Sequence, residues 1–390
     1  MNSPAARSDR HWMGRALALA ALAEGQTSPN PLVGCVVLDA TGQLVGEGYH
    51  RRAGEPHAEV MALRRAGERA RGGTLYVTLE PCCHHGRTPP CTEAVIAAGI
   101  TKVVVALTDP DPRVAGGGIS QLQQAGIAVI KGVCAAEAAV QNQAFVHRIR
   151  NGRPWGVLKW AMSLDGRTAL PNGASQWISG PPARSWVHQL RAGVDAVITG
   201  GGTVRADDPL LSSRGRRIPE PLRVVISRQL DLPQQAQIWN QELAPILVAH
   251  GESASAAAKE QLDQRGIERL ELKHCEPEAL LQALAERGCN RVLWECGPTL
   301  AAAAIAQDCV QELAAVVAPV VMGGIPAHTP VADLGFTTMD QVLRLPQTTP
   351  KSLGGDWIFQ SHLPGDGAGA SAFSKPMNSE GSAFSPDNSY

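Results

Sequence analysis

Four side chains that could support metal-assisted chemistry lie close together in the chain. They are His57 and Glu59 in "HAEVMAL", and Cys82 and Cys91 in "EPCCHHGRTPPC". A tetrahedral catalytic zinc ion takes three protein ligands and leaves the fourth position to water. His57, Cys82 and Cys91 supply that number of ligands. Glu59, two residues after His57, is expected to face the water and move protons without binding the metal.

The local sequence places these ligands at the starts of helices. His57 begins a helical pattern, and Cys82 follows Pro81 where a turn enters the next helical segment. A helix N-terminus lowers the pKa of a nearby thiol and favours the thiolate that zinc needs.

The residues alone leave other interpretations of this cluster open. A free cysteine is often only a small buried hydrophobic residue, and we expect Cys83 to be such a bystander. His84 and His85 are expected to line the pocket or to support the ligands from outside. In a closed structural zinc site, His84 would instead be the fourth ligand, and Glu59 would have no task.

Two glycine-rich turns later in the chain are candidates for nucleotide binding. "TGGGTV" follows the apolar run "DAVI", and "ECGPTLAAA" overlaps the end of "NRVLWECG". The main-chain amides of such strand-to-helix turns can bind phosphate. One glycine-rich turn is usually only a turn, but two at the ends of strands favour a nucleotide site. Neither matches GxGxxG, so an ordinary Rossmann domain is not predicted.

The elements that must position these groups form two α/β units. In the first, "LVGCVVLDATGQLVGEGYH" predicts a hairpin around residues 39–42, and "HAEVMALRRAGERARGG" predicts a helix. "TLYVTLEP" and "TKVVVALTDPDP" are expected strands, and "TEAVIAAG", "ISQLQQAG" and "AAEAAVQNQAFVHRIR" are expected helices. The first unit should therefore be an α/β layer with mixed strand directions.

The turn-prone joint "RNGRP" divides the chain, so we expect domains over residues 1–150 and 151–363. Strands of the second domain are expected at "WGVLKWAMSLDGRT", "DAVITGG", "LRVVIS", "PILVAH", "NRVLWECG" and "ELAAVVAPVV". Residues 364–390 are rich in Gly, Ala, Ser and Pro, which predicts a disordered tail.

The composition limits the classes of protein that fit. The 390 residues suit two or three domains, and 35 Lys and Arg residues balance 36 Asp and Glu residues, a net charge of -1. This balance argues against nucleic-acid and membrane partners and favours a small-molecule substrate. Nine thinly spread cysteines predict a reducing, cytoplasmic location. The segment "ALALAALAEG" could imitate a signal peptide, but we interpret it as part of an amphipathic helix over residues 11–24.

The metal-ligand pattern resembles that of the cytidine-deaminase superfamily. In those enzymes, zinc activates a water that attacks an amino-bearing ring carbon while a glutamate moves protons. The eight residues between Cys82 and Cys91 depart from the usual short spacing, and the insert "CHHGRTPP" is typical of the riboflavin-pathway deaminases.

Nine motifs in order extend the resemblance, over about residues 10–363, to the bacterial bifunctional riboflavin-biosynthesis deaminase/reductases. They are "PNPLVGC", "GEGYH", "GEPHAEV", "LEPCCHHGRTPPC", "DPDPRVAGGG", "KWAMSLDGRTA", "SQWISG", "TGGGTVRADDPLL" and "ECGPTLAAA". The resemblance implies an N-terminal cytidine-deaminase-like domain and a C-terminal dihydrofolate-reductase-like domain. The implied reactions are deamination of 2,5-diamino-6-(5-phosphoribosylamino)pyrimidin-4(3H)-one and NADPH reduction of its ribosyl group to a ribityl phosphate.

For the first domain, the resemblance assigns Zn2+ to His57, Cys82 and Cys91 and proton transfer to Glu59. It assigns substrate contacts to Asn30, His50, Arg87 and Asp109. A phosphorylated substrate needs such a cation with fixed amide and carboxylate partners. Asp111 stands where the family has asparagine, so its role is not assigned.

For the second domain, the resemblance assigns NADPH contacts to Ala161, Trp177, Thr203, Asp207, Ser227, Gly297, Pro298, Thr299, Leu300, Ala301, Ala302 and Ala303. It assigns substrate contacts to Lys159, Ser175, Arg191, Leu211, Arg214 and Glu295. The two arginines are expected to bind phosphate, and Lys159 to hold the open-chain sugar or its imine. The hydride chemistry belongs to the cofactor, so the protein supplies orientation and charge.

Two other functions would account for part of the sequence. A nucleoside or tRNA deaminase with an unrelated second domain would share the zinc cluster, although the near-neutral charge disfavours tRNA and "SLDGRT" with "DDP" disfavours an unrelated domain. A structural zinc module would bind a partner instead of a substrate. We expect a homo-oligomeric enzyme acting on phosphorylated pyrimidines, with no nucleic-acid partner.

Overall fold

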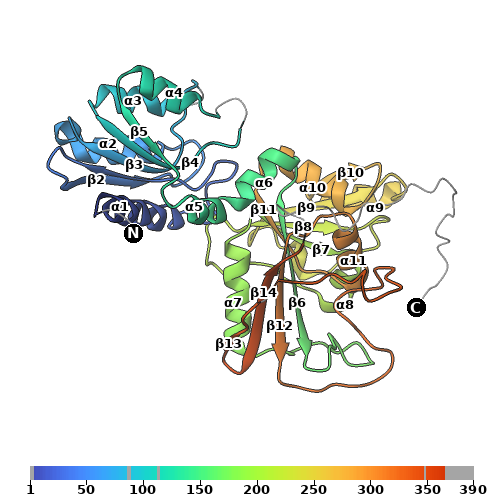
Figure 1. Cartoon of the computed structure of the whole chain (residues 1–390). Helices are drawn as coiled ribbons and strands as arrows, with labels where there is room; N and C mark the ends of the chain where they lie inside the picture. The colour runs from blue at the N-terminus through green and yellow to red at the C-terminus, as the bar shows by residue number, and fades with distance from the viewer. Residues whose placement is uncertain (1–3, 86–88, 112–114, 347, 365–390) are drawn as a thin grey trace.

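The computed structural model describes residues 4–85, 89–111, 115–346 and 348–364, and it contains two sheets with helices packed on them (Figure 1). The predicted tail from residue 365 on lies outside the described residues, as does the predicted substrate contact Arg87.

The first sheet has five strands in the order β2-β1-β3-β4-β5. β1 is antiparallel to β2 and β3, whereas β3, β4 and β5 are parallel. The strands are β1 (Gly34–Leu38), β2 (Leu44–Tyr49), β3 (Thr74–Leu79), β4 (Lys102–Leu107) and β5 (Ala128–Lys131). The helices of this unit are α1 (Pro4–Ala21), α2 (Ala58–Ala66) with a 3-10 turn (Gly67–Ala70), α3 (Cys91–Ala97), α4 (Gly117–Gln124), α5 (Ala135–Gln141) and α6 (Gln143–Asn151).

Helices cover both faces of the first sheet because its central strands are apolar on both sides. β1 buries all five of its residues. α2 and α4 pack on one face through Ala62 and Leu122, and α1 and α5 pack on the other through Met13 and Ala138. The predicted α/β layer with mixed strand directions is confirmed. The first helix is amphipathic, as interpreted, but α1 spans Pro4–Ala21 and not residues 11–24.

The second sheet has nine strands in the order β10-β9-β8-β7-β11-β6-β12-β14-β13. The strands from β10 to β12 in this order are parallel, and β14 and β13 are antiparallel to their neighbours. The strands are β6 (Trp155–Ser163), β7 (Ala196–Gly200), β8 (Leu222–Ile226), β9 (Ile246–Gly251), β10 (Glu268–Leu272), β11 (Arg291–Trp294), β12 (Glu312–Ala318), β13 (Lys351–Leu353) and β14 (Asp356–His362). The helices are α7 (Pro181–Ala192), α8 (Gly201–Asp207), a 3-10 turn (Gln237–Trp239), α9 (Ala256–Gln264), α10 (Pro277–Glu286) and α11 (Pro298–Ala306).

The arrangement of the second sheet brings the two glycine-rich turns together. α8 begins directly after β7, and α11 begins a few residues after β11. β7 and β11 are neighbouring parallel strands, so both turns lie at the same, carboxyl-terminal edge of the sheet. Helices α10 and α11 cover one face through Leu284 and Ala304, whereas α8 and α9 cover the other through Val204 and Leu262.

The structure differs from the sequence prediction in several elements. The single helix predicted over "AAEAAVQNQAFVHRIR" is two helices, because Asn142 lies between them and its side-chain amide bonds both the N–H and the C=O of Leu32. The predicted joint is partly helical, since α6 runs to Asn151 and ends at Gly152, which has a positive φ of 66°. Strands β5, β10, β13 and β14 were not predicted.

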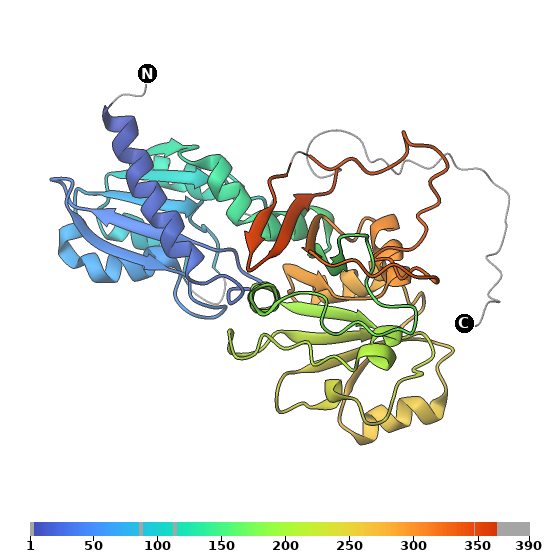
Figure 2. The ribbon, with the colours of Figure 1, turned by 90° about the horizontal axis from the view of Figure 1, so that it is seen from below.

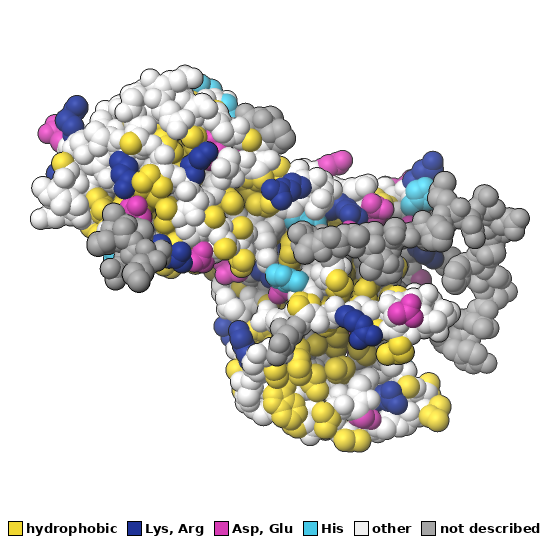
Figure 3. All heavy atoms as spheres, in the orientation of Figure 1, with side chains coloured by type: hydrophobic (Ala, Val, Ile, Leu, Met, Phe, Trp, Pro, Cys, Tyr) yellow, Lys and Arg dark blue, Asp and Glu magenta, His cyan; other side chains and the backbone are white. Residues whose placement is uncertain are grey.

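The surface carries apolar side chains over the end of the second sheet that contains β12, β13 and β14 (Figure 3). Exposed large side chains in this part of the chain include Val320, Val321, Trp357 and Phe359. Among the described helices, none has both the length and the apolar character that crossing a membrane requires.

Each sheet has its own core. The buried residues packed on the first sheet lie between Met13 and Ala138, and those packed on the second lie between Trp155 and Ile358.

A fragment of residues 1–150 should therefore fold alone, bind zinc and show deaminase activity without a reductant. Circular dichroism, zinc analysis and a deaminase assay check this. An insoluble or zinc-free fragment, with the full chain intact, would mean that folding of the first sheet needs the second.

Candidate active sites

Three ligand atoms converge at the edge of the first sheet. The ligand atoms of His57, Cys82 and Cys91 all lie within 4.8 Å of one another. His57 Nδ1 is 3.2 Å from Cys91 Sγ and 3.6 Å from Cys82 Sγ. Zinc bonds of about 2.3 Å to sulfur and 2.0–2.1 Å to nitrogen at tetrahedral angles separate the two atoms by roughly 3.5 Å. The three side chains therefore fit zinc, and within the described residues the exposed His84 is not part of the group.

The three ligands come from three different segments. His57 is the N-cap residue of α2, as the sequence predicted. Cys82 lies in the loop after β3, and Cys91 is the first residue of α3. The prediction that a helix follows Cys82 directly is wrong. The N-terminus of α3 reaches Cys82 through space instead, because the Cys91 N–H donates to Cys82 Sγ at 3.3 Å.

The environment of the two thiols favours one negative charge between them. A hydrogen bond from the Cys91 thiol lowers the pKa of Cys82 to about 4 against the opposing effect of burial, and His57 contributes in the same direction. The same hydrogen bond, together with burial, raises the pKa of Cys91. Because metal ligation requires the thiolate form, Cys82 is the thiol already prepared for it.

Glu59 is buried beside this group. It lies in the first turn of α2 and is 3% exposed. Burial raises the pKa of Glu59 to about 7, although His57 acts to lower it. A carboxyl group with a pKa near neutrality can both accept and release a proton in one catalytic cycle.

Two further residues assigned by the resemblance lie next to the ligands. His50 is buried, and its ring meets the ring of His57 edge-on, with 5.3 Å between centroids. Burial lowers the pKa of His50, which favours the neutral imidazole. Its Nδ1 faces the Pro56 C=O at 3.3 Å, so its Nε2 accepts from the Asn30 amide at 2.9 Å.

Sequence reasoning missed Glu80, the buried residue that fixes the loop containing Asp109. The Glu80 carboxylate accepts from the N–H groups of Asp109, Gly116 and Ile119 at 3.0–3.2 Å. Burial raises the pKa of Asp109 to about 6. The N–H of Asp111 donates to Asp109 at 2.9 Å. The only sequence signal for Glu80 was its place before Pro81 at the end of a strand.

Cys83 is not part of the ligand group. Its sulfur faces Gly117 of α4 instead, since a Cβ added to Gly117 would lie 2.9 Å from that sulfur.

A second cluster of charged side chains lies in the other domain. Glu295 directly follows β11, and its carboxylate accepts from Arg191 Nε at 2.6 Å and from a terminal nitrogen of Arg191 at 3.0 Å. Lys159 Nζ of β6 is 3.7 Å from the same carboxylate. The Ser212 C=O also accepts from Arg191, at 3.0 Å. The resemblance had grouped these charged residues as substrate contacts, and the fold brings them together.

The charged groups in this cluster shift each other's pKa values. Burial opposes the ionisation of Glu295, but Arg191 and Lys159 outweigh it and lower the pKa of Glu295 to about 2. Burial lowers the pKa of Lys159, while Glu295 limits that decrease. The structure thus holds the buried Glu295 carboxylate between the cations of Arg191 and Lys159. A polar substrate could bind to such a cluster.

Several residues assigned to the cofactor also lie together. Gly201 at the start of α8 is beside Ser227, since a Cβ there would be 3.0 Å from the Ser227 hydroxyl. In the same way, Gly297 faces Thr203 and Gly200 faces Leu300. The assigned residues Thr203, Ser227 and Gly297, which follow β7, β8 and β11, thus border one region at the carboxyl-terminal edge of the sheet.

The remaining assigned residues occupy different environments. The Ser175 hydroxyl donates to Asp207 at 3.0 Å. Trp177 is 69% exposed, with the Arg184 guanidinium 4.6 Å from its ring centroid. Arg214 is exposed and Ala161 is half-buried. Leu211 is only 2% exposed, so a substrate contact there would involve its main chain.

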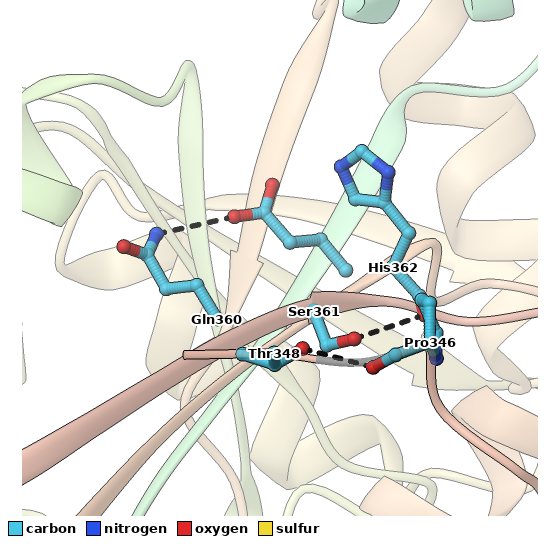
Figure 4. Close-up of a pocket in the computed structure, with 6 residues that line it drawn as sticks. Pro346, Thr348, Gln360, Ser361 and His362 are labelled. Atoms are coloured by element: carbon cyan, nitrogen blue, oxygen red, sulfur yellow. Dashed lines mark hydrogen bonds between the residues drawn. The ribbon is translucent and has the colours of Figure 1, made fainter. Parts of the chain in front are cut away.

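A polar cavity of about 240 Å³ lies away from both sites. It is lined by Glu312, Pro346, Thr348, Gln360, Ser361 and His362, and Gln360 donates to Glu312 at 3.3 Å (Figure 4). Glu312 begins β12, so this cavity lies at the amino-terminal end of that strand, opposite the edge with the glycine-rich turns.

The fold and the two clusters define the class of protein: a zinc-dependent deaminase domain joined to a reductase domain of the dihydrofolate-reductase type. Residues 6–107 match the family model of the cytidine and deoxycytidylate deaminase zinc-binding region, and residues 154–359 match that of the RibD C-terminal domain. The chain belongs to the RibD family of riboflavin biosynthesis proteins, and it is a bifunctional deaminase and reductase of that pathway.

Relatives and solved structures cover nearly the whole chain. The chain is 49% identical to the riboflavin biosynthesis protein RibD of Synechocystis over 92% of this chain and 97% of the relative. Its structure is similar to that of Acinetobacter baumannii RibD, with a TM-score of 0.83, 42% identity, and coverage of 92% of this chain and 99% of the other. It is also similar to a deaminase/reductase from Thermotoga maritima, with a TM-score of 0.80, 32% identity and the same coverage. Both halves match one family, so the alternative of an unrelated second domain is excluded.

Replacing Glu59 tests the proton-transfer role. Glu59→Gln keeps the shape of the side chain and removes its ability to take a proton, so deamination should fall roughly 10²–10⁴-fold. The zinc content should not change. Glu68→Gln, the same substitution at an exposed position, should leave both quantities at wild-type values. Wild-type deamination by Glu59→Gln would refute the role, and loss of zinc would make Glu59 a ligand or a support.

Replacing Arg191 tests the charged cluster. Arg191→Ala would remove the expected charge-assisted contact with the substrate phosphate, which is worth about 1.5–3 kcal/mol. The kcat/KM for reduction should therefore fall roughly 10- to 150-fold. Deamination should stay near normal because Arg191 bonds to Glu295 and Ser212 of its own domain. Arg269→Ala is the matched control, because it breaks an exposed ion pair between Arg269 on the edge strand β10 and Asp263 on α9. An unchanged kcat/KM for reduction would show that Arg191 has a purely structural role. An equal loss of both reactions would indicate misfolding.

Proposed function

We propose that the chain converts 2,5-diamino-6-(5-phosphoribosylamino)pyrimidin-4(3H)-one in two steps, a hydrolytic deamination followed by an NADPH-dependent reduction of the ribosyl group to ribityl phosphate. The observation that carries the first step is the buried carboxyl of Glu59 beside three converging zinc-ligand atoms. The second step is supported by the cluster around Glu295 next to two glycine-rich turns.

In the deaminase site, His57, Cys82 and Cys91 would hold the ion. Zinc, when bound, makes water a better nucleophile at neutral pH. Glu59 accepts the two protons of the attacking water in turn, delivering the first to the ring nitrogen and the second to the departing amino group. The water oxygen becomes the carbonyl oxygen of the ring, the carbon–nitrogen bond to the amino group breaks, and ammonia leaves, so the step needs no further reactant. Burial of Glu59 keeps bulk water from competing for those protons.

Substrate binding at this site would use polar groups that the fold already holds in place. The Asn30 amide and the His50 ring are bonded to each other, which leaves the rest of the Asn30 amide to contact the pyrimidine. Asp109 sits on the loop fixed by Glu80 and could contact the ribose or ring substituents. We assign the phosphate to Arg87, which lies outside the described residues.

In the reductase site, Glu295 orients Lys159 and Arg191 toward the ribosyl phosphate. NADPH, when bound, supplies the hydride. Lys159 holds the open-chain sugar or its imine, and its lowered pKa makes the ammonium a better proton donor. Arg191 has two guanidinium N–H groups beyond those bonded to Glu295 and Ser212, and with the exposed Arg214 it would bind the substrate phosphate.

The preference for NADPH over NADH is part of the proposal. The turns after β7 and β11 would bind the cofactor through Thr203, Asp207 and the residues from Gly297 to Ala303. Ser227 faces this region from the end of β8, and the exposed Arg228 that follows it offers a cation for the phosphate that distinguishes NADPH.

We also propose a homo-oligomer in a reducing, cytoplasmic compartment. Exposed apolar side chains such as Trp357 and Phe359 on β14 favour a protein partner on that surface, and all nine cysteines are free thiols. The domain boundary near residue 151 belongs to the same proposal, since each sheet has its own core.

Product analysis tests the proposed reactions directly. The purified enzyme should convert the diamino substrate to the deaminated ribosyl compound without a reductant, and to the ribityl compound when NADPH is added. NADH should support the second step poorly. Mass spectrometry of the products checks both steps. An unchanged pyrimidine amino group, or reduction without prior deamination, would contradict the proposal.

A further inference from the structure

The two domains meet at the loop that carries Asn30. Residues 28–30 of the first domain lie against residues 288–290, just before β11 of the second, and Gly25 ahead of this loop lies against Ala192 at the end of α7 (Figure 2). The approach is close, because a Cβ on Gly288 would be 3.0 Å from Pro29, and a Cβ on Gly25 would be 2.3 Å from the Ala192 C=O. The loop is therefore held by the reductase domain as well as by its own.

Ser28 anchors the loop to two reductase residues. Its hydroxyl donates to Asp195 Oδ2 at 2.8 Å and accepts from the Asn290 side-chain amide at 3.1 Å. The same Asp195 oxygen accepts from the N–H groups of Asn290 and Arg291 at 2.7 and 3.0 Å. Asp195 thus fixes the start of β11 and the loop at one point.

Asn290 is the centre of the junction. Its side chain accepts from Arg148 Nε at 2.6 Å and donates both to Ser28 and to the Asn30 C=O, at 3.3 Å. Arg148 also donates to the Pro29 C=O at 2.9 Å. Asn290 is 7% exposed, and a buried amide with partners for both its nitrogen and its oxygen has a well-defined orientation.

A continuous chain of contacts leads from this junction to the zinc ligands. Asn290 holds the main chain of Asn30, and the Asn30 side chain donates to His50 at 2.9 Å. The His50 ring lies edge-on against that of His57. A shift of Asn30 would therefore displace a proposed substrate contact and its neighbour, while the ligands themselves remain anchored on α2 and α3.

We propose that Asn290, a residue of the reductase domain, positions Asn30 for substrate binding by the deaminase domain. The inference rests on the proposed contact between Asn30 and the pyrimidine. Asn290 lies in neither proposed substrate site, so it is a positioning residue, with Ser28 and Asp195 as its partners. The fusion of the two domains then has a structural consequence: the deaminase needs its reductase to bind substrate with full affinity.

Kinetics of the full-length, zinc-loaded enzyme test this inference. Asn290→Ala removes the bonds to Asn30 and Ser28, and the loss of hydrogen bonds of this kind should raise KM for deamination about 3- to 10-fold. The kcat for deamination should stay within about twofold, because Glu59 and the ligands are untouched. Zinc content and both kinetic constants for reduction should match the wild type. Ser28→Ala, made on the deaminase side of the junction, should give the same split between KM and kcat.

A double-mutant cycle shows whether the effect passes through Asn30. Asn30→Ala alone should raise KM, and adding Asn290→Ala should raise it no further. Glu24→Gln is the control variant. It removes the ion pair between Glu24 and Arg291, which lies in the same junction with 3.7 Å between the charged atoms, and it should leave both reactions unchanged.

The inference would be overturned by an unchanged KM in both Asn290→Ala and Ser28→Ala, by additive effects in the double variant, or by an equal loss of deamination and reduction. If Asn30→Ala itself has no effect, the substrate contact proposed for Asn30 fails, and any effect of Asn290→Ala must arise elsewhere, which also refutes the inference. A wild-type enzyme that does not deaminate the pyrimidine at all would instead refute the proposed function.

Discussion

The structure depends on bringing one nitrogen and two sulfur atoms from distant segments to a single point. His57, Cys82 and Cys91 lie on α2, the loop after β3 and α3, and only the packing of these elements on the first sheet makes them neighbours. Folding brings negative charge together at this point, since Glu59 is buried there beside Cys82, whose thiol has a lowered pKa. A divalent cation compensates for that negative charge, so the cation that completes the fold locally is also the one that the chemistry requires.

In the second domain, side-chain cations balance the charge of a buried carboxylate. Glu295 is buried, and its charge is balanced by Arg191 and Lys159 from two other elements. Such a cluster is stable only when its members are held in good geometry, because an unpaired buried charge costs several kcal/mol. In both domains, a buried carboxylate is therefore the residue around which the site is organised. We propose that the carboxylate moves protons in the first domain and orients cations in the second.

The sequence predicted the zinc site well because its information is local. Residue types and spacing were enough for the ligand group His57, Cys82 and Cys91, and they pointed to Glu59, whose proton-transfer role stays a prediction. The periodicity of apolar residues predicted most strands. The reductase residues came from the resemblance, since no short motif indicates that Arg191 meets Glu295 across 104 positions. The missed strands have physical reasons: β5 and β10 are short and largely exposed at sheet edges. β14 does alternate buried and exposed residues, and that pattern was available. The contacts of Asn290 with the first domain join residues far apart in the chain, so nothing in the local sequence could indicate them.

The central claim is that the zinc ion has three protein ligands and one position open to water and substrate. X-ray absorption spectroscopy at the zinc edge of the purified enzyme measures this directly. The account predicts two sulfur atoms at about 2.3 Å, one imidazole nitrogen at about 2.0–2.1 Å, and one light atom that is not imidazole. Two sulfur atoms with two imidazoles would show a closed structural site, with a second histidine such as His84 in the fourth position, and would contradict the account.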